Sequence, residues 1–269
     1  MKLLKISNQE HAELDEYFDE VKSANLDKVS PEVKENKADV EVDGESIDGF
    51  DAVFADIPAE NVTFGRIFLE IAEEKGLSMN YPSTAYFVMS KKSYLYHVLH
   101  ERSVSTPKIA VVGDERAARN LENHVKGPLI ARKFEELSEV EKKKIDTVED
   151  IGNFTEGIEY GEDFLLFQEY SAGDKYRCLV AGDSLISLED VSDGWEIRED
   201  NLRYSNVPAE VKNVVLEAKN ALGTKVAEVI VRNNQVVDVN PNPDLELYSE
   251  VSGKDVYKSV SETLQEEAA

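Results

Sequence analysis

The segment with the clearest capacity for chemistry lies near the end of the chain, where Asp238 and Asn240 stand in an apolar run that stops at Pro241. Alternate side chains of a strand share one face, so the carboxylate and the amide point the same way and Val237 and Val239 lie behind them. Hard oxygen ligands of this kind suit Mg²⁺. A polar strand end followed by turn residues explains the pattern equally well from this segment alone.

Glu228 stands on the preceding apolar segment, and the direction of its side chain depends on the loop between the two segments. A two-residue loop of Asn233 and Asn234 would pair Glu228 with Val239, on the face away from Asp238. A three-residue loop would place Glu228 directly opposite Asp238. A solvent-facing acid is the alternative interpretation of the same residue.

Hydrophobic periodicity predicts the elements that would position these residues. In the N-terminal part, strands are expected over residues 2–6 and 51–56, and a helix over residues 64–76 follows and ends at a glycine. Residues 9–23 have the pattern of a charged helix, and the polar stretch 30–49 is expected to be mostly connection. A strand, a helix and a second strand in a short block predict a small α/β layer domain.

The remainder of the chain mixes strands and helices. Helices are expected to begin near Lys92 and at Pro208, and another to run through residues 256–264; strands are expected over residues 108–112, 128–133, 164–170, 176–181, 185–188, 226–231 and 236–240. The charged stretch 135–150 is expected to be partly helical, because Glu139 and Lys143 stand four residues apart.

The charge of the chain is unusual, with 55 Asp and Glu against 30 Lys and Arg and a net charge of −25. Such a surface repels nucleic-acid phosphates, so DNA or RNA is not expected as a partner. The acidic residues are spread along a chain that keeps its apolar periodicity, which argues against disorder. We expect a folded protein adapted to a salty cytoplasm, where screening weakens the repulsion among its acids.

The expected compartment is cytoplasmic. No run of about 18 apolar residues is present, so we do not expect the chain to cross a membrane. The N-terminal residues become polar too soon for a signal peptide. Cys178 is the single cysteine, which excludes an internal disulfide and fits a reducing environment.

Several segments, taken in order, resemble the ATP-grasp superfamily and its RimK-type amino-acid ligases. The segments that carry the resemblance are the carboxylate–amide–proline run 238–243, the helix end 221–223, the closing helix start 252–256, the adenine-holding hinge 167–170 and the hairpin 174–183. Lys92 also lies at the family's spacing from Pro107. The resemblance extends from about Asp51 to about Leu264.

The resemblance implies an α/β (α+β) ATP-grasp fold with a small pre-ATP-grasp domain. That N-terminal domain would comprise residues 1–90, and the ATP-grasp domain residues 91–269. Within the latter, about 108–166 would form a lid-like subdomain and 167–269 the metal and catalytic subdomain.

The chemistry implied by the resemblance is ATP- and Mg²⁺-dependent carboxylate–amine ligation. ATP would phosphorylate a substrate carboxylate, and an amine would then attack the acylphosphate. The partners would be a carboxylate on a small molecule or a protein tail, together with an amino acid. A homo-oligomer is implied in the same way.

The resemblance also assigns roles to individual residues. ATP would be bound by Lys92, Arg132, Lys133, Gln168, Glu169, Tyr170, Asp174 and Lys175, with Lys133 as the alternative to Arg132 and the hinge acting through its backbone. Mg²⁺ would be held by Glu228, Asp238 and Asn240. Arg177 and Asn242 would act near the acceptor and the acylphosphate, and Arg198, Asn201 and Arg203 would bind the acceptor.

Two departures from the family pattern leave a second hypothesis open. The glycine-rich phosphate loop is expected after Lys133, but residues 134–141 contain four glutamates and no glycine. Ile230 stands where an earlier metal carboxylate is expected. The alternative to an active ligase is therefore a catalytically degenerate ATP-grasp protein that binds a ligand or a partner.

Overall fold

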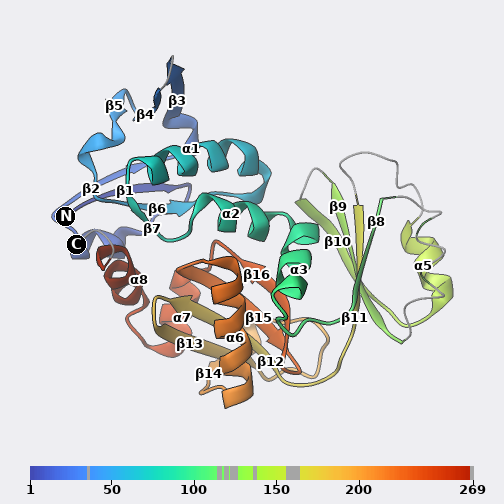
Figure 1. The fold of residues 1–269 in the computed structure, drawn as a ribbon. Coiled ribbons are helices and arrows are strands. Elements are labelled where there is room, and N and C mark those ends of the chain that lie inside the picture. The colour runs from blue at the N-terminus through green and yellow to red at the C-terminus, as the bar shows by residue number, and fades with distance from the viewer. Residues whose placement is uncertain are drawn as a thin grey trace.

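The computed structural model describes residues 1–34, 37–113, 117, 121, 127–135, 138–155 and 164–266. The described strands form four sheets (Figure 1). Within the described residues, no helix is long and apolar enough to cross a membrane.

The N-terminal sheet is parallel, with strand order β2-β1-β6-β7. Its strands are β1 (Lys2–Ser7), β2 (Glu20–Ala24), β6 (Ala52–Asp56) and β7 (Ser78–Met79). Helices α1 (Val62–Glu74) and α2 (Ser83–Ser90) follow β6. The expected helix that ends at a glycine is confirmed, because Gly76 has a φ of +74°.

The expected helix over residues 9–23 is wrong. A 3-10 helix covers Ala12–Tyr17, and β2 then pairs with β1. Only Leu14 of that short helix is buried, so it has too little apolar contact to extend a helix through the segment. The hydrogen bonds along the edge of β1 are satisfied instead by β2.

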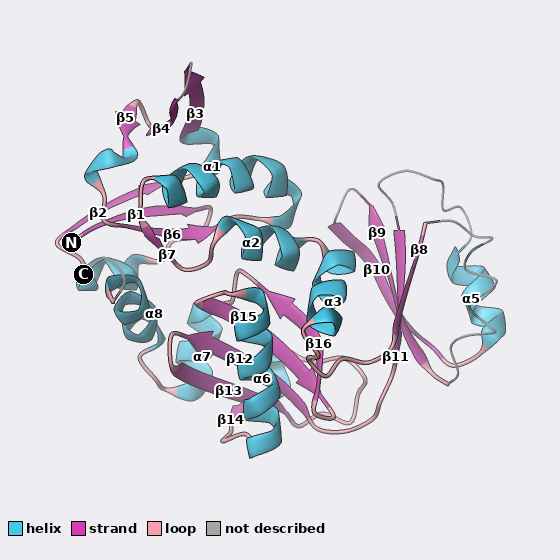
Figure 2. Cartoon of the chain, in the orientation of Figure 1, coloured by secondary structure: helices cyan, strands magenta, loops and turns pink. Residues whose placement is uncertain are grey.

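The expected connection over residues 30–49 is also wrong. It forms the sheet β3-β4-β5, made of β3 (Val29–Lys34), β4 (Lys37–Val42) and β5 (Glu45–Ser46), and then a 3-10 turn (Figure 2). Pro31 is tolerated because β3 is the edge strand of this sheet. Val40 and Val42 are fully buried. The alternation of these apolar residues with polar ones was the sequence signal of β4.

The central sheet is antiparallel, with strand order β14-β13-β12-β15-β16. Its strands are β12 (Lys175–Ala181), β13 (Ser184–Asp190), β14 (Leu202–Tyr204), β15 (Val226–Arg232) and β16 (Gln235–Asn240). Helix α6 (Ala209–Leu222) follows Pro208 and ends at Gly223, which is left-handed. The expected hairpin between β12 and β13 and the expected helix are both confirmed.

The third sheet has strand order β10-β9-β11-β8 and a hydrophobic core of its own. Its strands are β8 (Ile109–Val112), β9 (Leu129–Glu135), β10 (Ser138–Ile145) and β11 (Phe164–Glu169), and helix α5 (Val148–Thr155) follows β10. Helix α3 (Lys92–Glu101) precedes this sheet and begins at the expected residue. Figure 1 shows the third sheet set apart from the N-terminal sheet.

The charged stretch 138–145 forms β10 and not a helix. Every residue of β10 from Ser138 to Lys144 is paired or bulged against β9. The i,i+4 pair of Glu139 and Lys143 stabilises a helix by only about 0.2–0.5 kcal/mol, which is less than the ladder provides. Of residues 146–150, only those from Val148 onward are helical, and they form the start of α5.

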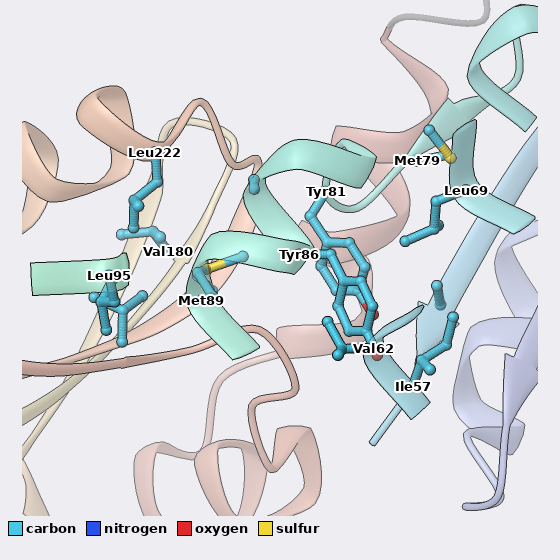
Figure 3. Packing of buried hydrophobic residues seen from close by; sticks show 14 of the residues in the cluster. Ile57, Val62, Leu69, Met79, Tyr81, Tyr86, Met89, Leu95, Val180 and Leu222 are labelled. Atoms are coloured by element: carbon cyan, nitrogen blue, oxygen red, sulfur yellow. The ribbon is translucent and has the colours of Figure 1, made fainter. Parts of the chain in front are cut away.

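The N-terminal sheet and the central sheet share one hydrophobic core. Val53 of β6 and Phe68 of α1 belong to the same buried cluster as Val180 of β12 and Val239 of β16. Tyr81 and Tyr86 stack within that cluster with ring centroids 5.4 Å apart (Figure 3). Residues 1–90 are therefore packed against the central sheet as part of one core.

The C-terminal helices complete the other face of the N-terminal sheet. Helices α7 (Leu245–Ser252) and α8 (Val256–Gln265) contribute to a second buried cluster. Leu3 and Phe54 of the N-terminal sheet pack there with Val260 and Leu264 of α8. The two ends of the chain are thus brought side by side, as Figure 1 shows.

Candidate active site

One face of the central sheet carries a row of side chains that crosses three strands. Arg177 of β12 is paired with Ile230 of β15, and Ile230 is paired with Asp238 of β16. Directly paired residues of an antiparallel sheet share a face, so these three side chains point to the same side. Arg232 and Gln235 form the neighbouring row of β15 and β16.

The register of β15 and β16 depends on both a turn and a bulge. Asn233 and Asn234 form a two-residue loop with φ values of 47° and 58°. The register then shifts between Ile230 and Val231, so that Glu228 lies opposite Asn240. The two expected cross-strand pairings of Glu228, with Val239 or with Asp238, are therefore both wrong. The length of the loop does not reveal a bulge.

Asp238 lies at the centre of a buried ion-pair network. Its Oδ1 accepts hydrogen bonds from Lys92 Nζ at 2.7 Å and from the Val239 N–H at 2.8 Å, and its Oδ2 accepts one from Arg132 Nη2 at 2.9 Å. Burial opposes ionisation of the carboxyl group. The charges of Lys92 and Arg132 outweigh that effect and hold the pKa of Asp238 well below its usual range.

Arg132 reaches this network from β9, in the facing sheet. Its Nε is ion-paired with Glu139, and its Nη1 donates to the Tyr96 hydroxyl at 3.3 Å. The Tyr96 hydroxyl in turn donates to the carbonyl of Val237 at 2.6 Å. These contacts join α3, β9, β10 and β16 around the Asp238 carboxylate.

A cavity of about 450 Å³ lies between the two sheets. The hinge residues Gln168, Glu169 and Tyr170 line one part of it, and Arg132, Arg177 and Asp238 line another. Its remaining walls are formed by Pro107, Ile130, Lys142, Ser171, Trp195, Glu196, Ile197, Ile230, Arg232, Gln235 and Val237. The cavity therefore combines apolar walls with several cations, in a protein whose net charge is −25.

A second cavity of about 290 Å³ adjoins the first at Arg132, which lines both. Lys92, Asn240 and Asn242 line this second cavity. Asn240 Oδ1 accepts from the Asn242 N–H at 3.0 Å, and Asn242 Nδ2 donates to the carbonyl of Ile57 at 2.7 Å. The end of β16 is thereby attached to the N-terminal unit.

Glu228 is held by a cation and a hydroxyl. Arg177 Nε donates to Glu228 Oε1 at 2.5 Å, and the Tyr248 hydroxyl donates to the same oxygen at 2.9 Å. Glu228 is 1% exposed, so it is not the solvent-facing acid that was the alternative. Arg177 Nη1 also forms an ion pair at 3.1 Å with Glu199, whose side chain is exposed.

Lys175 is buried, and its ammonium binds a loop. It forms an ion pair with Asp190 at 2.9 Å and donates to the carbonyls of Ser192 at 2.8 Å and Gly194 at 2.9 Å. Those contacts use the hydrogen-bond donors of the Lys175 ammonium. The loop that Lys175 holds carries Trp195 to the cavity.

The other expected residues lie away from the cavity lining. Lys133 pairs with Glu135 at 3.0 Å, and the side chain of Arg203 is 63% exposed and pairs with Glu189 at 3.1 Å. Asp174, Arg198 and Asn201 also do not line the cavity. Of the expected phosphate-loop segment 134–141, residues 136 and 137 lie outside the described residues.

Among the cavity residues that the sequence analysis did not assign to the site are Lys142, Trp195 and Arg232. Arg232 could have been found, because it stands two residues after Ile230 and so shares its strand face. Lys142 could not, because its segment was expected to be helical. Trp195 depends on the loop that Lys175 holds.

The residues fit Mg²⁺ that arrives together with a nucleotide. Among the described residues, no three His, Cys, Asp or Glu side chains converge as a metal cage. Mg²⁺ commonly takes only one or two protein carboxylates and completes its shell with phosphates and water. Asp238 and Asn240 share a sheet face and offer such ligands, whereas Glu228 is bound to Arg177 and Tyr248.

Comparison with known proteins finds ligases that are similar to this chain. No protein-family model matches it. The probable alpha-L-glutamate ligase of Trichodesmium erythraeum (strain IMS101) is 25% identical over 244 residues, which cover 85% of this chain and 81% of that relative. The probable alpha-L-glutamate ligase of Pseudomonas entomophila (strain L48) is 26% identical over 248 residues, covering 87% and 82%.

Solved structures share the fold. The ATP-grasp ligase PsnB in complex with a minimal precursor matches with a TM-score of 0.75 at 17% identity, covering 100% of this chain and 98% of that chain. The same ligase is also known with Mg and ADP. A RimK domain protein from Sphaerobacter thermophilus DSM 20745 matches with a TM-score of 0.70 at 16% identity, covering 98% and 99%.

The fold of this chain is that of ATP-grasp ligases, and its main cavity lies between the central sheet and the third sheet. The curated relatives, at 25–26% identity, are named alpha-L-glutamate ligases, and a RimK domain protein is among the structures that share the fold. The resemblance noted from the sequence is confirmed.

Proposed function

We propose that this protein is an ATP- and Mg²⁺-dependent carboxylate–amine ligase that acts through an acylphosphate. The observation that supports the proposal best is the cavity between the two sheets, where the hinge residues and the network of Arg132 and Asp238 line one continuous space. The named relatives are ligases, and none of these comparisons favours a protein without catalysis.

The hinge would bind the base of ATP. Gln168 and Glu169, at the end of β11, and the following Tyr170 line the cavity. Gln168 Nε2 donates to the Val237 carbonyl at 3.3 Å. Ile130 and Ile230 supply apolar surface for a planar ring. Ile230 thus has a place in the site although it stands where a carboxylate was expected.

The triphosphate would extend from the hinge toward Arg132 and Lys92. Both cations are held at Asp238, so they are already oriented before an anion enters. Mg²⁺ would be held by Asp238 and Asn240 and would neutralise phosphate charge. We assign Lys175 to positioning of the 192–196 loop, since its donors are used there.

The reaction has two displacements. An oxygen of the acceptor carboxylate bonds to the γ-phosphorus of ATP, the bond from that phosphorus to the bridging oxygen breaks, and ADP leaves. The amine nitrogen then bonds to the acyl carbon, phosphate leaves, and the nitrogen loses a proton. The role of the protein in both steps is to orient the reactants and to stabilise negative charge with Arg132 and Arg177.

The substrates follow from the relatives as a proposal. We take an amino acid as the amine donor, with glutamate as the first to test, because the named relatives are alpha-L-glutamate ligases. The acceptor would be a carboxylate on a small molecule or a peptide, and PsnB was solved with a precursor peptide. A cytoplasmic location fits the free, buried Cys178, whose thiol pKa burial raises.

Calorimetric titration of ATP in buffer with molar KCl tests the proposal. We expect ATP to bind with a dissociation constant between about 1 µM and 1 mM when Mg²⁺ is present, within the usual range of enzyme substrates. Omission of Mg²⁺ should weaken binding, and addition of glutamate with a carboxylate acceptor should release ADP and phosphate. Failure of ATP, ADP and a non-hydrolysable analogue to bind would favour the degenerate alternative.

Salt adaptation is a separate proposal that rests on the net charge of −25. The Debye length falls from about 10 Å at 0.1 M salt to about 3 Å at 1 M, so molar KCl should remove most repulsion between surface acids. We expect the urea midpoint of unfolding to rise between 0.1 M and 2 M KCl. Equal midpoints at the two concentrations would contradict the proposal.

A further inference from the structure

We propose that Lys142 of β10 is a phosphate-binding residue of the nucleotide site, in place of backbone groups of a glycine-rich loop. The inference rests on the proposed function and assigns a specific side chain to it. The segment 134–141 has no glycine with which to approach phosphates closely.

The first support is geometric. Lys142 is paired directly with Arg132 across the β9–β10 ladder, so the two side chains leave the sheet on the same face. Both line the cavity of about 450 Å³. The ladder therefore delivers two cations side by side into the space where the triphosphate would lie.

The second support is the unequal pairing of these two cations. Arg132 is ion-paired with Asp238 and Glu139. Lys142 forms no ion pair among the described residues, and its Nζ lies 5.8 Å from the centroid of the Trp195 ring. Partial burial and then the charge of Arg132 lower the pKa of Lys142, against the opposing effect of Glu139, Asp238 and Glu196.

Like charges placed directly opposite on two strands are destabilising. An anion bound between Arg132 and Lys142 would convert that repulsion into two attractions. Glu139 and Asp238, which pair with Arg132, offset part of this repulsion, and a bound anion would offset the rest.

The neighbouring lysines are used differently, which singles out Lys142. Lys142 and Lys143 are both exposed, but Lys143 is paired with Ala131 and so lies on the opposite face of the ladder. Lys144 shares the face of Lys142, but its ammonium pairs with Asp146 at 2.8 Å and lies 5.1 Å from the Tyr170 ring centroid. Lys143 is therefore a matched control with the same chemistry.

The test compares Lys142→Met with Lys143→Met and Lys142→Arg, using titrations of ATP, ADP and adenosine with Mg²⁺ present. We expect Lys142→Met to weaken ATP binding about tenfold or more and to leave adenosine binding within twofold. Lys143→Met should bind ATP like the wild type. Lys142→Arg should recover most of the affinity, because it restores the positive charge.

The thermal midpoint of the unliganded variants separates binding from folding. Lys142→Met should unfold at the same temperature as the wild type or a higher one, because it removes a repulsion. Equal ATP affinity of wild type and Lys142→Met would overturn the inference about Lys142 but leave the proposed function standing. A parallel loss of adenosine binding and thermal stability would assign Lys142 a structural role instead. Absence of ATP binding by the wild type would remove the proposed function, and the inference with it.

Discussion

Replacement of Asp238 by asparagine is expected to lower the rate of ATP-dependent ligation at least about 100-fold, as loss of a metal ligand or of a preorganised charge does. The carboxylate accepts hydrogen bonds from Lys92 and Arg132 and offers the proposed Mg²⁺ ligand. An amide in its place keeps the shape but not the charge. The measurement is kcat for ADP release at saturating ATP and substrates.

Asp183→Asn is the matched control, since Asp183 is an exposed aspartate in the turn between β12 and β13. We expect its kcat to remain within twofold of the wild type. An Asp238→Asn variant that kept wild-type kcat would contradict the assignment of Asp238 to the site.

The same variant has a pH-dependent stability readout. The pKa of Asp238 is lower in the folded protein than in the unfolded chain, where it is about 3.9. The unfolded chain therefore binds the proton more readily, and ionised Asp238 contributes stability that is fully present above about pH 5 and is lost as the pH falls toward the folded pKa. The stability difference between wild type and Asp238→Asn should be constant near neutral pH and shrink below about pH 4.

Replacement of Arg177 by methionine is expected to reduce the free energy of unfolding by about 3–5 kcal/mol. Glu228 is 1% exposed, and Arg177 is its cationic partner at 2.5 Å. Without the guanidinium, Glu228 keeps only the Tyr248 hydroxyl in the described structure and must remain charged without compensation or take up a proton. Urea unfolding at pH 7 measures the loss.

A double variant separates the ion pair from any catalytic role of Arg177. Adding Glu228→Gln to Arg177→Met removes the uncompensated charge, so it should restore most of the lost stability. Arg203→Met is the control at an exposed pair with Glu189 and should cost less than about 1 kcal/mol. A double variant no more stable than Arg177→Met would contradict the charge argument. If the double variant is stable but inactive while Glu228→Gln alone stays active, Arg177 acts in catalysis as the sequence resemblance implied.

Local patterns predicted the strands and helices whose own residues carry a clear period. The helix from Pro208 to Gly223 and the hairpin around Gly182 depend on side-chain alternation and turn residues that are neighbours in the chain. Residues 9–23 and 30–49 were predicted wrongly, because their strands are stabilised by pairing partners elsewhere and carry few apolar residues.

In the candidate site, too, some features follow from local sequence and others from contacts between distant segments. The chain itself determined that Asp238 and Asn240 share a strand face, and that the segments follow the ATP-grasp order. Tertiary structure alone decided that Ile230 faces Asp238, because a bulge in β16 shifts the ladder by one residue. It also decided that Lys142 opposes Arg132, since cross-strand pairing, and not helix spacing, sets the direction of that side chain. Ion pairs such as Lys92 with Asp238 join residues 146 positions apart, and no local pattern encodes such a contact.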